Sequence, residues 1–173
     1  MTKSDNPNNI PMIAITGKKN SGKTTVIEKL IGLLSNKGWR VGTIKHHHHG
    51  DFEPDTPGKD SYRHFEAGAT GVVLASPRKS AFFERTEDEI PSVESLVRFF
   101  NEKTNLILLE GFHSSSLPRI EISRKEISSD LLTVNNELLI AVVTDNEKIL
   151  FDQKFSFDEI EDLAEFLNKY LRK

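Results

Sequence analysis

The sequence predicts an α/β fold in three layers, with a mainly parallel central sheet covered by helices on both faces. Short, continuously apolar runs such as residues 106–109 are typical of strands that are buried on both faces. These runs alternate along the chain with segments whose apolar residues recur at helical spacing. The chain has 173 residues, of which 36% are hydrophobic, so it suits one folded domain and is too apolar to be disordered.

The first part of the chain leads into a strand and a helix. Residues 1–10 are rich in Asn, Asp, Ser and Pro, and we expect them to be a flexible lead-in to a single domain over residues 11–173. Residues 11–16 are an apolar run that ends at a glycine, which predicts a buried strand. From Thr24 the period becomes helical, and the helix is expected to end near Lys37-Gly38, a pair typical of a helix C-terminus.

The middle of the chain predicts smaller elements. Residues 39–45 alternate apolar and small side chains and are expected to be a strand, followed by a polar loop over residues 46–59. Residues 60–69 suit a short helix. Residues 71–75 and 80–84 are then expected to be two further strands.

The last part of the chain repeats the alternation of helix and strand. Residues 92–100 carry apolar side chains on one helical face, and residues 106–109 are the most apolar run, which predicts the central strand. Residues 118–123 and 138–143 are expected to be strands. Residues 156–171 carry an apolar stripe that predicts a terminal helix.

Composition excludes several classes of protein. The net charge is −3, from 23 basic and 26 acidic residues, so no global positive field would hold nucleic acid. No apolar run approaches the roughly 18 residues of a membrane span, and the polar N-terminal residues do not resemble a secretory signal. Cysteine is absent, which excludes disulfides and thiolate chemistry. We therefore expect a cytoplasmic protein.

Residues 17–24 match the phosphate-binding pattern G-x-x-x-x-G-K-[ST], and the match lies between a predicted strand and a predicted helix, as the motif requires. Backbone N–H groups of such a loop surround phosphate oxygens at the positive end of the helix. A glycine-rich turn with a surface lysine is the alternative. We expect a P-loop NTPase fold, with Lys23 acting on the β- and γ-phosphates and Thr24 on Mg²⁺. The expected nucleotide-binding residues are Gly17, Lys18, Lys19, Asn20, Ser21, Gly22, Lys23, Thr24 and Thr25.

Lys18 follows the first glycine of this loop. Some dimeric P-loop proteins carry a lysine here that reaches the nucleotide of the partner subunit, and a solvated loop lysine is the alternative.

Carboxylates near the predicted strand ends suit Mg²⁺. Glu110 follows the central strand, at the edge of the sheet where open α/β proteins bind ligands, and we expect it to hold the metal and to join Lys23 in catalysis. An exposed strand-end carboxylate is the alternative. Either Asp55 or Asp60 is expected to complete the metal shell, although a turn and a helix cap explain these residues equally well.

Four consecutive histidines, residues 46–49, follow the second predicted strand. Imidazoles there could bind a transition metal, bind an anionic ligand, or belong to a polar loop.

Several of these segments together resemble one family, the molybdopterin-guanine dinucleotide biosynthesis adaptor (MobB) family. The resemblance covers the chain from residue 12 and is carried by Gly22-Lys23-Thr24-Thr25, Lys45-His46-x-His48-His49, Pro57-Gly58-Lys59-Asp60-Ser61-Tyr62, Ala67-Gly68-Ala69 and Leu109-Glu110-Gly111-Phe112. It implies a homodimeric, weakly hydrolysing GTP-binding protein that assists a guanylyltransferase. It also implies that molybdopterin is a second ligand, with His46, His48 and His49 facing that ligand or the partner and His47 incidental.

The guanine signature Asn-Lys-x-Asp is absent from the sequence. Asp145, after a late strand, is the best candidate to accept hydrogen bonds from guanine N1 and N2, and a strand-end turn is the alternative.

Two other functions remain open at this point. The histidine run would also suit a P-loop metallochaperone for nickel or zinc, although the absence of cysteine counts against it. An ATP-dependent small-molecule kinase would use the same phosphate loop, with ATP preferred over GTP.

Overall fold

The computed structural model describes residues 10–47, 53, 55–86, 90–133 and 137–172. The chain divides into two compact units. We call residues up to His46 and from Leu96 onward the sheet body, and residues His47–Ser95 the hairpin unit. In the part of the chain that the structure describes, no helix is long and apolar enough to cross a membrane. The single-domain expectation for residues 11–173 stays a prediction.

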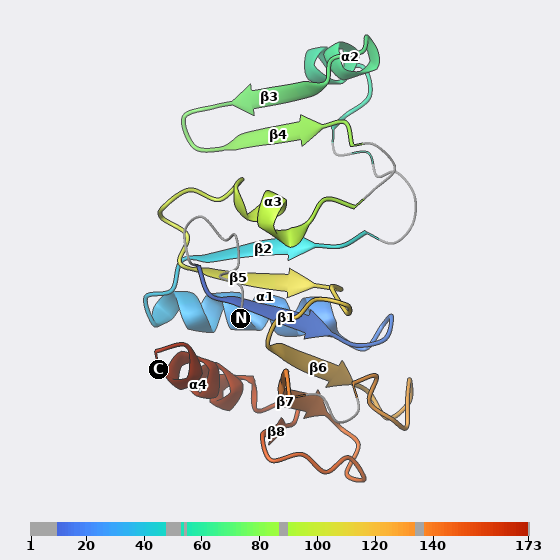
Figure 1. Cartoon of the computed structure of the whole chain (residues 1–173), viewed down its shortest axis with the longest axis vertical. Coiled ribbons are helices and arrows are strands. Elements are labelled where there is room, and N and C mark those ends of the chain that lie inside the picture. The colour runs from blue at the N-terminus through green and yellow to red at the C-terminus, as the bar shows by residue number, and fades with distance from the viewer. Residues whose placement is uncertain (1–9, 48–52, 54, 87–89, 134–136, 173) are drawn as a thin grey trace. The chain divides into compact units, whose positions relative to one another are not determined.

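The sheet body is built on six strands in the order β2-β5-β1-β6-β7-β8, and every neighbouring pair is parallel (Figure 1). The predicted α/β fold with a mainly parallel sheet is therefore confirmed. The strands are β1 (Met12–Thr16), β2 (Val41–Lys45), β5 (Leu106–Glu110), β6 (Arg119–Ser123), β7 (Leu139–Thr144) and β8 (Lys154–Phe155).

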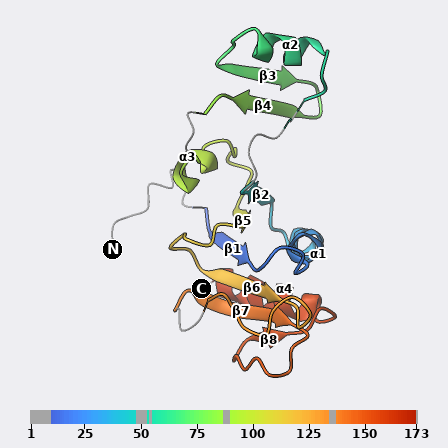
Figure 2. The ribbon, with the colours of Figure 1, turned by 90° about the vertical axis from the view of Figure 1, so that its right-hand side faces the viewer.

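The helices α1 (Lys23–Asn36) and α4 (Ile160–Leu171) pack together and share one core cluster with the sheet (Figure 2). Alternate side chains of each central strand enter this cluster, as the period of a strand requires. Helical spacing gives α1 and α4 one buried face each. The cluster includes Ile13, Ile15, Leu106, Leu108, Ile120 and Ile122 from the strands and Leu30, Leu34, Leu163 and Leu167 from the helices.

The side chains that point away from this cluster, on the other face of the central strands, are buried as well. For this reason the strands are continuous apolar runs in the sequence. Ala14, Ile107 and Leu109 are fully buried. Val142 of β7 packs with Ile149 in a second, smaller cluster. Both faces of the central strands are therefore covered.

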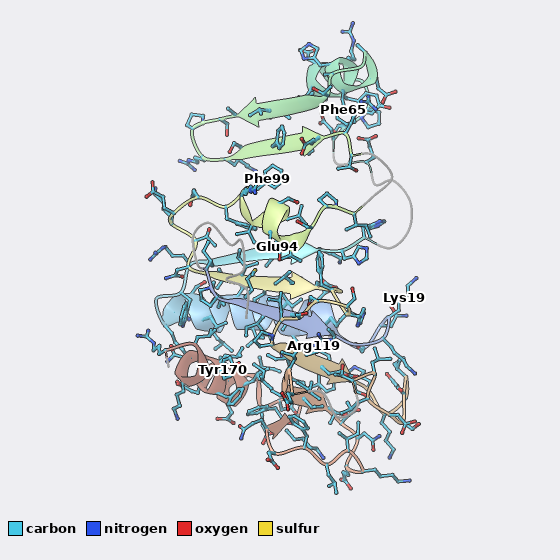
Figure 3. All side chains as sticks on the ribbon, in the orientation of Figure 1. Lys19, Phe65, Glu94, Phe99, Arg119 and Tyr170 are labelled. Carbon is cyan, nitrogen blue, oxygen red and sulfur yellow. The ribbon has the colours of Figure 1, made fainter. Side chains whose placement is uncertain are left out.

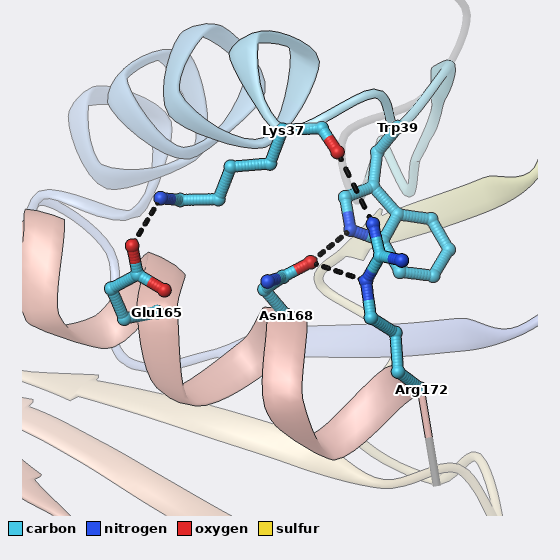
Figure 4. Close-up of polar contacts among 5 residues, drawn as sticks. All are labelled: Lys37, Trp39, Glu165, Asn168 and Arg172. Atoms are coloured by element: carbon cyan, nitrogen blue, oxygen red, sulfur yellow. Dashed lines mark hydrogen bonds and ion pairs between the residues drawn. The ribbon is translucent and has the colours of Figure 1, made fainter.

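Five residues connect the C-terminal end of α1 to α4 through hydrogen bonds and an ion pair (Figure 4). Lys37 forms an ion pair with Glu165. The Trp39 indole N–H donates to Asn168 Oδ1 at 3.0 Å, and Arg172 Nε donates to the same oxygen at 2.9 Å. Arg172 Nη2 also donates to the Lys37 carbonyl at 3.3 Å. We call this group the helix clasp.

The hairpin unit has a different construction. The helix α2 (Asp60–Glu66) precedes an antiparallel hairpin of β3 (Gly71–Ala75) and β4 (Ser80–Glu84). The Arg85 guanidinium lies 4.1 Å from the centroid of the Phe65 ring and donates to the Ala69 carbonyl. No described residue of this unit is buried. The helix α3 (Val93–Val97) crosses the boundary between the units.

The element boundaries differ from the prediction mainly near the end of the chain. The terminal helix begins at Ile160 instead of residue 156, because Ser156 and Glu159 form a turn in which the Ser156 N–H donates to the Glu159 carboxylate at 2.7 Å. The strand β8 was not predicted, since two residues show no period. The helix α3 is shorter than the predicted 92–100.

Candidate functional site: a phosphate-binding loop

Residues 17–22 form a tight loop between β1 and α1, residues 23 and 24 begin α1, and the first residue of the loop must be glycine. Gly17 has a φ of +139°, which L side chains rarely adopt. A Cβ atom here would lie 2.2 Å from the Ile122 carbonyl oxygen of the neighbouring strand β6. The first glycine of the pattern is therefore fixed by close contact with the sheet.

The turn continues through two further residues with positive φ, Asn20 at +64° and Gly22 at +95°. Asparagine is among the few residues that tolerate this region. The Ser21 N–H donates to the Lys18 carbonyl at 3.2 Å, and the Val26 N–H donates to the Gly22 carbonyl at 3.0 Å as α1 begins. The loop thus curls back at the N-terminus of α1, where backbone N–H groups and the helix dipole favour an anion.

The Lys23 side chain closes over this loop. Its Nζ donates to the Gly17 carbonyl at 2.9 Å and to the Lys18 carbonyl at 2.8 Å. Partial burial lowers the pKa of Lys23, while the charge of Glu110 opposes that shift. The ammonium is therefore held at the mouth of the loop, within the field of a carboxylate.

Glu110, at the end of β5, meets the start of α1. The Thr24 hydroxyl donates to Glu110 Oε1 at 3.2 Å. Lys45 Nζ lies 3.5 Å from Glu110 Oε2, and only 16% of the Glu110 side chain is exposed. Thr24 and Glu110 are 86 positions apart in the chain, and their hydroxyl and carboxylate groups meet beside the phosphate loop. Oxygen donors of these two kinds are those that Mg²⁺ prefers.

The segment after Glu110 is tied to the sheet on both sides. The Gly111 N–H donates to the Ile15 carbonyl, and the His46 N–H donates to the Glu110 carbonyl. The imidazole of His46 and the ring of Phe112 lie 5.5 Å apart, centroid to centroid. His46 is therefore placed at the same edge of the sheet as Glu110.

Arg119, which is labelled in Figure 3, donates hydrogen bonds to the loop that follows Glu110 and was not predicted as a site residue from the sequence. The residue is 5% exposed, its Nη1 donates to the His113 carbonyl at 2.6 Å, and its Nη2 donates to the Ser115 carbonyl. Nothing in the sequence pattern marks it, because an arginine that opens an apolar strand resembles a surface residue.

The remaining predicted residues lie in several places. Lys18, Lys19, Asn20 and Thr25 are exposed on the loop or the first turn of α1, and Figure 3 shows Lys19 extending outward. His48 and His49 lie outside the described residues. Asp55 and Asp60 belong to the hairpin unit, where Asp55 Oδ1 accepts the Thr56 N–H at 2.7 Å and Asp60 begins α2. The metal role of these two aspartates stays a prediction.

Asp145 follows β7 and already has local partners. Its Oδ1 accepts the Lys125 N–H at 2.7 Å, and its Oδ2 lies 3.5 Å from Arg124 Nη1. Arg124 in turn lies over the ring of Phe157. Neither Arg124 nor Phe157 was predicted, since three separate loops supply this cluster and no motif links them.

A glycine-rich loop between β1 and α1, with a strand-end carboxylate facing it across a parallel sheet, defines a P-loop NTPase-like protein. The sequence profile described as molybdopterin guanine dinucleotide synthesis protein B, MobB, matches residues 12–145. The chain belongs to the MobB family.

Relatives and solved structures agree with this assignment. The molybdopterin-guanine dinucleotide biosynthesis adapter protein of Haemophilus influenzae is 36% identical over 165 residues, which cover 95% of this chain and 91% of that protein. The Escherichia coli protein of the same name is 34% identical over 95% of each chain. A crystal structure of MobB has a TM-score of 0.74 at 30% identity and covers 94% of this chain and 99% of its own. Bacillus subtilis MobB has a TM-score of 0.71 at 30% identity, over 92% of this chain and 97% of its own.

Proposed function

We propose that this chain is a cytoplasmic, GTP-binding adapter that assists a guanylyltransferase in making molybdopterin guanine dinucleotide. Family membership supports the pathway, and the names of the relatives support the adapter role. The observation that best supports a nucleotide site is the contact of Thr24 with Glu110 beside the phosphate loop, over which Lys23 lies.

The loop residues have separate roles in this proposal. The N–H groups of residues 18–25 and the N-terminus of α1 bind the phosphates. Lys23 exchanges its two carbonyl partners for the β- and γ-phosphate oxygens. Thr24 and Glu110 would hold Mg²⁺, which supplies positive charge next to the phosphates when bound.

Hydrolysis is expected to be slow. Glu110 already accepts the Thr24 hydroxyl and faces Lys45, so it suits metal binding better than proton abstraction. Lys23 contributes charge to the transferred phosphate and provides no base. This combination suits a protein whose bound nucleotide controls a partner.

We place the second ligand at the same edge of the sheet. His46 follows β2 beside Glu110 and packs against Phe112, and His48 and His49 come two and three residues later in the chain. Imidazoles here would meet molybdopterin or the guanylyltransferase.

We also propose a homodimer. The hairpin unit exposes 66% of Val73 and 43% of Phe82, apolar surface of the kind that a second copy covers. In such a dimer Lys18, which is exposed, would reach the nucleotide of the partner subunit. Sedimentation of the purified chain tests the oligomeric state.

Calorimetry with GTP and Mg²⁺ tests the nucleotide site. The variant Lys23→Ala is expected to lose at least about 100-fold in affinity, because two charge-assisted contacts disappear. Lys29→Ala, which removes an exposed lysine from the same helix, is the matched control and should bind like the wild type. Normal GTP binding by Lys23→Ala would show that the site is assigned wrongly.

A second experiment separates the adapter from the two other functions. The purified chain should bind a purified molybdenum cofactor guanylyltransferase. Tighter binding of ATP than GTP, with rapid turnover of an acceptor, would instead indicate a kinase. Stoichiometric Ni²⁺ or Zn²⁺ binding that is lost on replacing His46, His48 and His49 would indicate a metallochaperone.

A further inference from the structure

Three loops at the carboxyl edge of the sheet place chemically distinct side chains next to one another. Arg124 follows β6, Asp145 follows β7, and Phe157 comes shortly after β8. These strands are consecutive neighbours in the sheet and all run parallel. A cation, a carboxylate and an aromatic ring therefore meet at the edge where α/β proteins bind ligands.

The three side chains are in contact. The Arg124 guanidinium carbon lies 3.9 Å from the centroid of the Phe157 ring, which is cation–π geometry. Arg124 Nη1 lies 3.5 Å from Asp145 Oδ2, and the Lys125 N–H holds the other carboxylate oxygen at 2.7 Å. The aromatic ring and the carboxylate thus fix the guanidinium from two sides.

This cluster adjoins the phosphate loop. A Cβ atom on Gly22 would lie 3.4 Å from Phe157 Cε1 and 3.7 Å from Arg124 Nε. Gly22 immediately precedes Lys23, whose side chain caps the loop. A ligand with its phosphates in the loop therefore has this cluster within the reach of its sugar and base.

The chemistry of the cluster suits a nucleobase. A guanidinium plane or an aromatic face stacks on a nucleobase. The Phe157 ring covers one side of the Arg124 guanidinium, and 35% of the Arg124 side chain remains exposed. Asp145 is 42% exposed, and a carboxylate has about four lone-pair positions, so the Lys125 N–H leaves it able to accept further hydrogen bonds.

Guanine and adenine differ at the edge that Asp145 would meet. Guanine presents two adjacent donors, the N1–H and the 2-amino group, which one carboxylate can accept together. Adenine presents an acceptor at N1, which a carboxylate repels. Asp145 therefore favours guanine, while the stacking surface accepts either base.

We propose that Arg124, backed by Phe157, is the surface on which the nucleobase stacks, and that Asp145 reads the guanine edge. This inference rests on the nucleotide site of the proposed function. It adds the stacking surface of Arg124 and Phe157 to Asp145, which the sequence alone already indicated for the guanine edge. It makes affinity for the base separable from affinity for the phosphates.

The stacking role is tested by comparing GTP with inorganic triphosphate, both with Mg²⁺, by calorimetry. Arg124→Ala should lower the affinity for GTP by about tenfold or more, since stacking contributes roughly 1–3 kcal/mol per base. It should change the affinity for triphosphate by less than about twofold. Arg124→Lys keeps the charge but not the plane and should behave like Arg124→Ala. Phe157→Leu keeps an apolar side chain but removes the ring, and it should lower the affinity for GTP several-fold. Lys148→Ala, an exposed lysine in the loop after β7, is the charge-matched control.

Base reading is tested with a second nucleotide pair. Asp145→Asn should lose affinity for GTP and gain affinity for xanthosine triphosphate, because the side-chain amide can donate to the 2-oxo group of xanthine. Circular dichroism should show a fold like that of the wild type for each variant.

The outcomes separate this inference from the proposed function. Equal loss of GTP and triphosphate affinity in Arg124→Ala would make Arg124 a phosphate contact and overturn the stacking role. Unchanged base preference in Asp145→Asn would overturn the edge-reading role. Wild-type protein that binds triphosphate as tightly as GTP would overturn the whole base site while leaving the phosphate loop intact. Failure to bind either ligand would overturn the proposed function as well.

Discussion

The sheet body and the hairpin unit differ most in how they use apolar residues. In the body, strands and helices of opposite ends of the chain share one buried cluster, and the phosphate loop is anchored on it. In the hairpin unit no described residue is buried, although Val73, Leu74 and Phe82 are apolar and exposed. The buried cluster thus stabilises the sheet body, whereas the hairpin unit leaves apolar side chains exposed on its surface.

Size explains this difference. A two-stranded hairpin with a helix of seven residues has too little apolar surface to form a core, and isolated hairpins are marginal in water. The six-stranded sheet has two faces to bury. A site that needs fixed geometry is therefore found in the body, and the hairpin unit suits contact with another molecule.

The largest expected effect comes from the core of the body. Leu108→Ala in β5 should lower the free energy of unfolding by about 2–5 kcal/mol, because it leaves a cavity at a position that is 1% exposed. Val73→Ala in β3 should change it by less than about 0.5 kcal/mol. Urea denaturation followed by circular dichroism measures both. Similar losses at the two positions would contradict the distinction between the units.

Two glycines with positive φ give the next comparison. Gly17→Ala should abolish GTP binding and cost about 3 kcal/mol or more, since the new methyl group meets the Ile122 carbonyl. Gly58→Ala, in the hairpin unit, has nothing within 4 Å of the new atom and should cost only the backbone strain of about 1–2 kcal/mol. Thermal unfolding and nucleotide titration are the measurements. Retained GTP binding in Gly17→Ala would show that the loop can move away from β6.

A substitution on the hairpin should affect association without affecting the body. Phe82→Ser is expected to weaken self-association by about tenfold, since an exposed aromatic side chain contributes about 1.4 kcal/mol or more when it is covered. The free energy of unfolding of the sheet body should change by less than about 0.5 kcal/mol, because Phe82 lies outside its buried cluster. GTP affinity should fall as the dimer dissociates, because Lys18 would then no longer reach the nucleotide of the partner subunit. Analytical ultracentrifugation with calorimetry on the same samples would reveal a loss of GTP binding that tracks dissociation, which would mean that the site needs both subunits.

The smallest effect depends on pH. The hydrogen bond from Lys37, followed by its charge, holds the pKa of Glu165 below its ordinary value of 4.5. Because the folded pKa is the lower one, this carboxylate stabilises the fold above pH 4.5, and the contribution is lost as the pH falls through the folded pKa. Glu165→Gln should therefore melt slightly lower than the wild type at pH 7. The two melting temperatures should converge in acid, and a constant difference would mean that packing is responsible.

Local patterns and long-range contacts were predictable to different degrees. The loop at residues 17–24 and the carboxylate at Glu110 follow from motifs and strand ends, and the structure brings Thr24 and Glu110 into hydrogen-bond contact, while their metal role stays a prediction. Arg119, Arg124 and Phe157 could not be predicted, because their contacts depend on the register of β6, β7 and β8. A two-residue strand such as β8 has no period, yet Phe157, which follows it, lies beside Gly22 of the phosphate loop.

The helix clasp has a consequence for the order in which the protein is made. Trp39 and Asn168 are 129 positions apart, and the buried face of α1 is completed only by α4. The phosphate loop and α1 therefore leave the ribosome well before α4 is made. Translation at roughly 5–20 residues per second leaves the part of the α1 face that α4 covers exposed for many seconds. A nascent chain of this kind completes the core beneath the loop only near the end of synthesis, so stalled or truncated products would lack the packed support of the proposed nucleotide site.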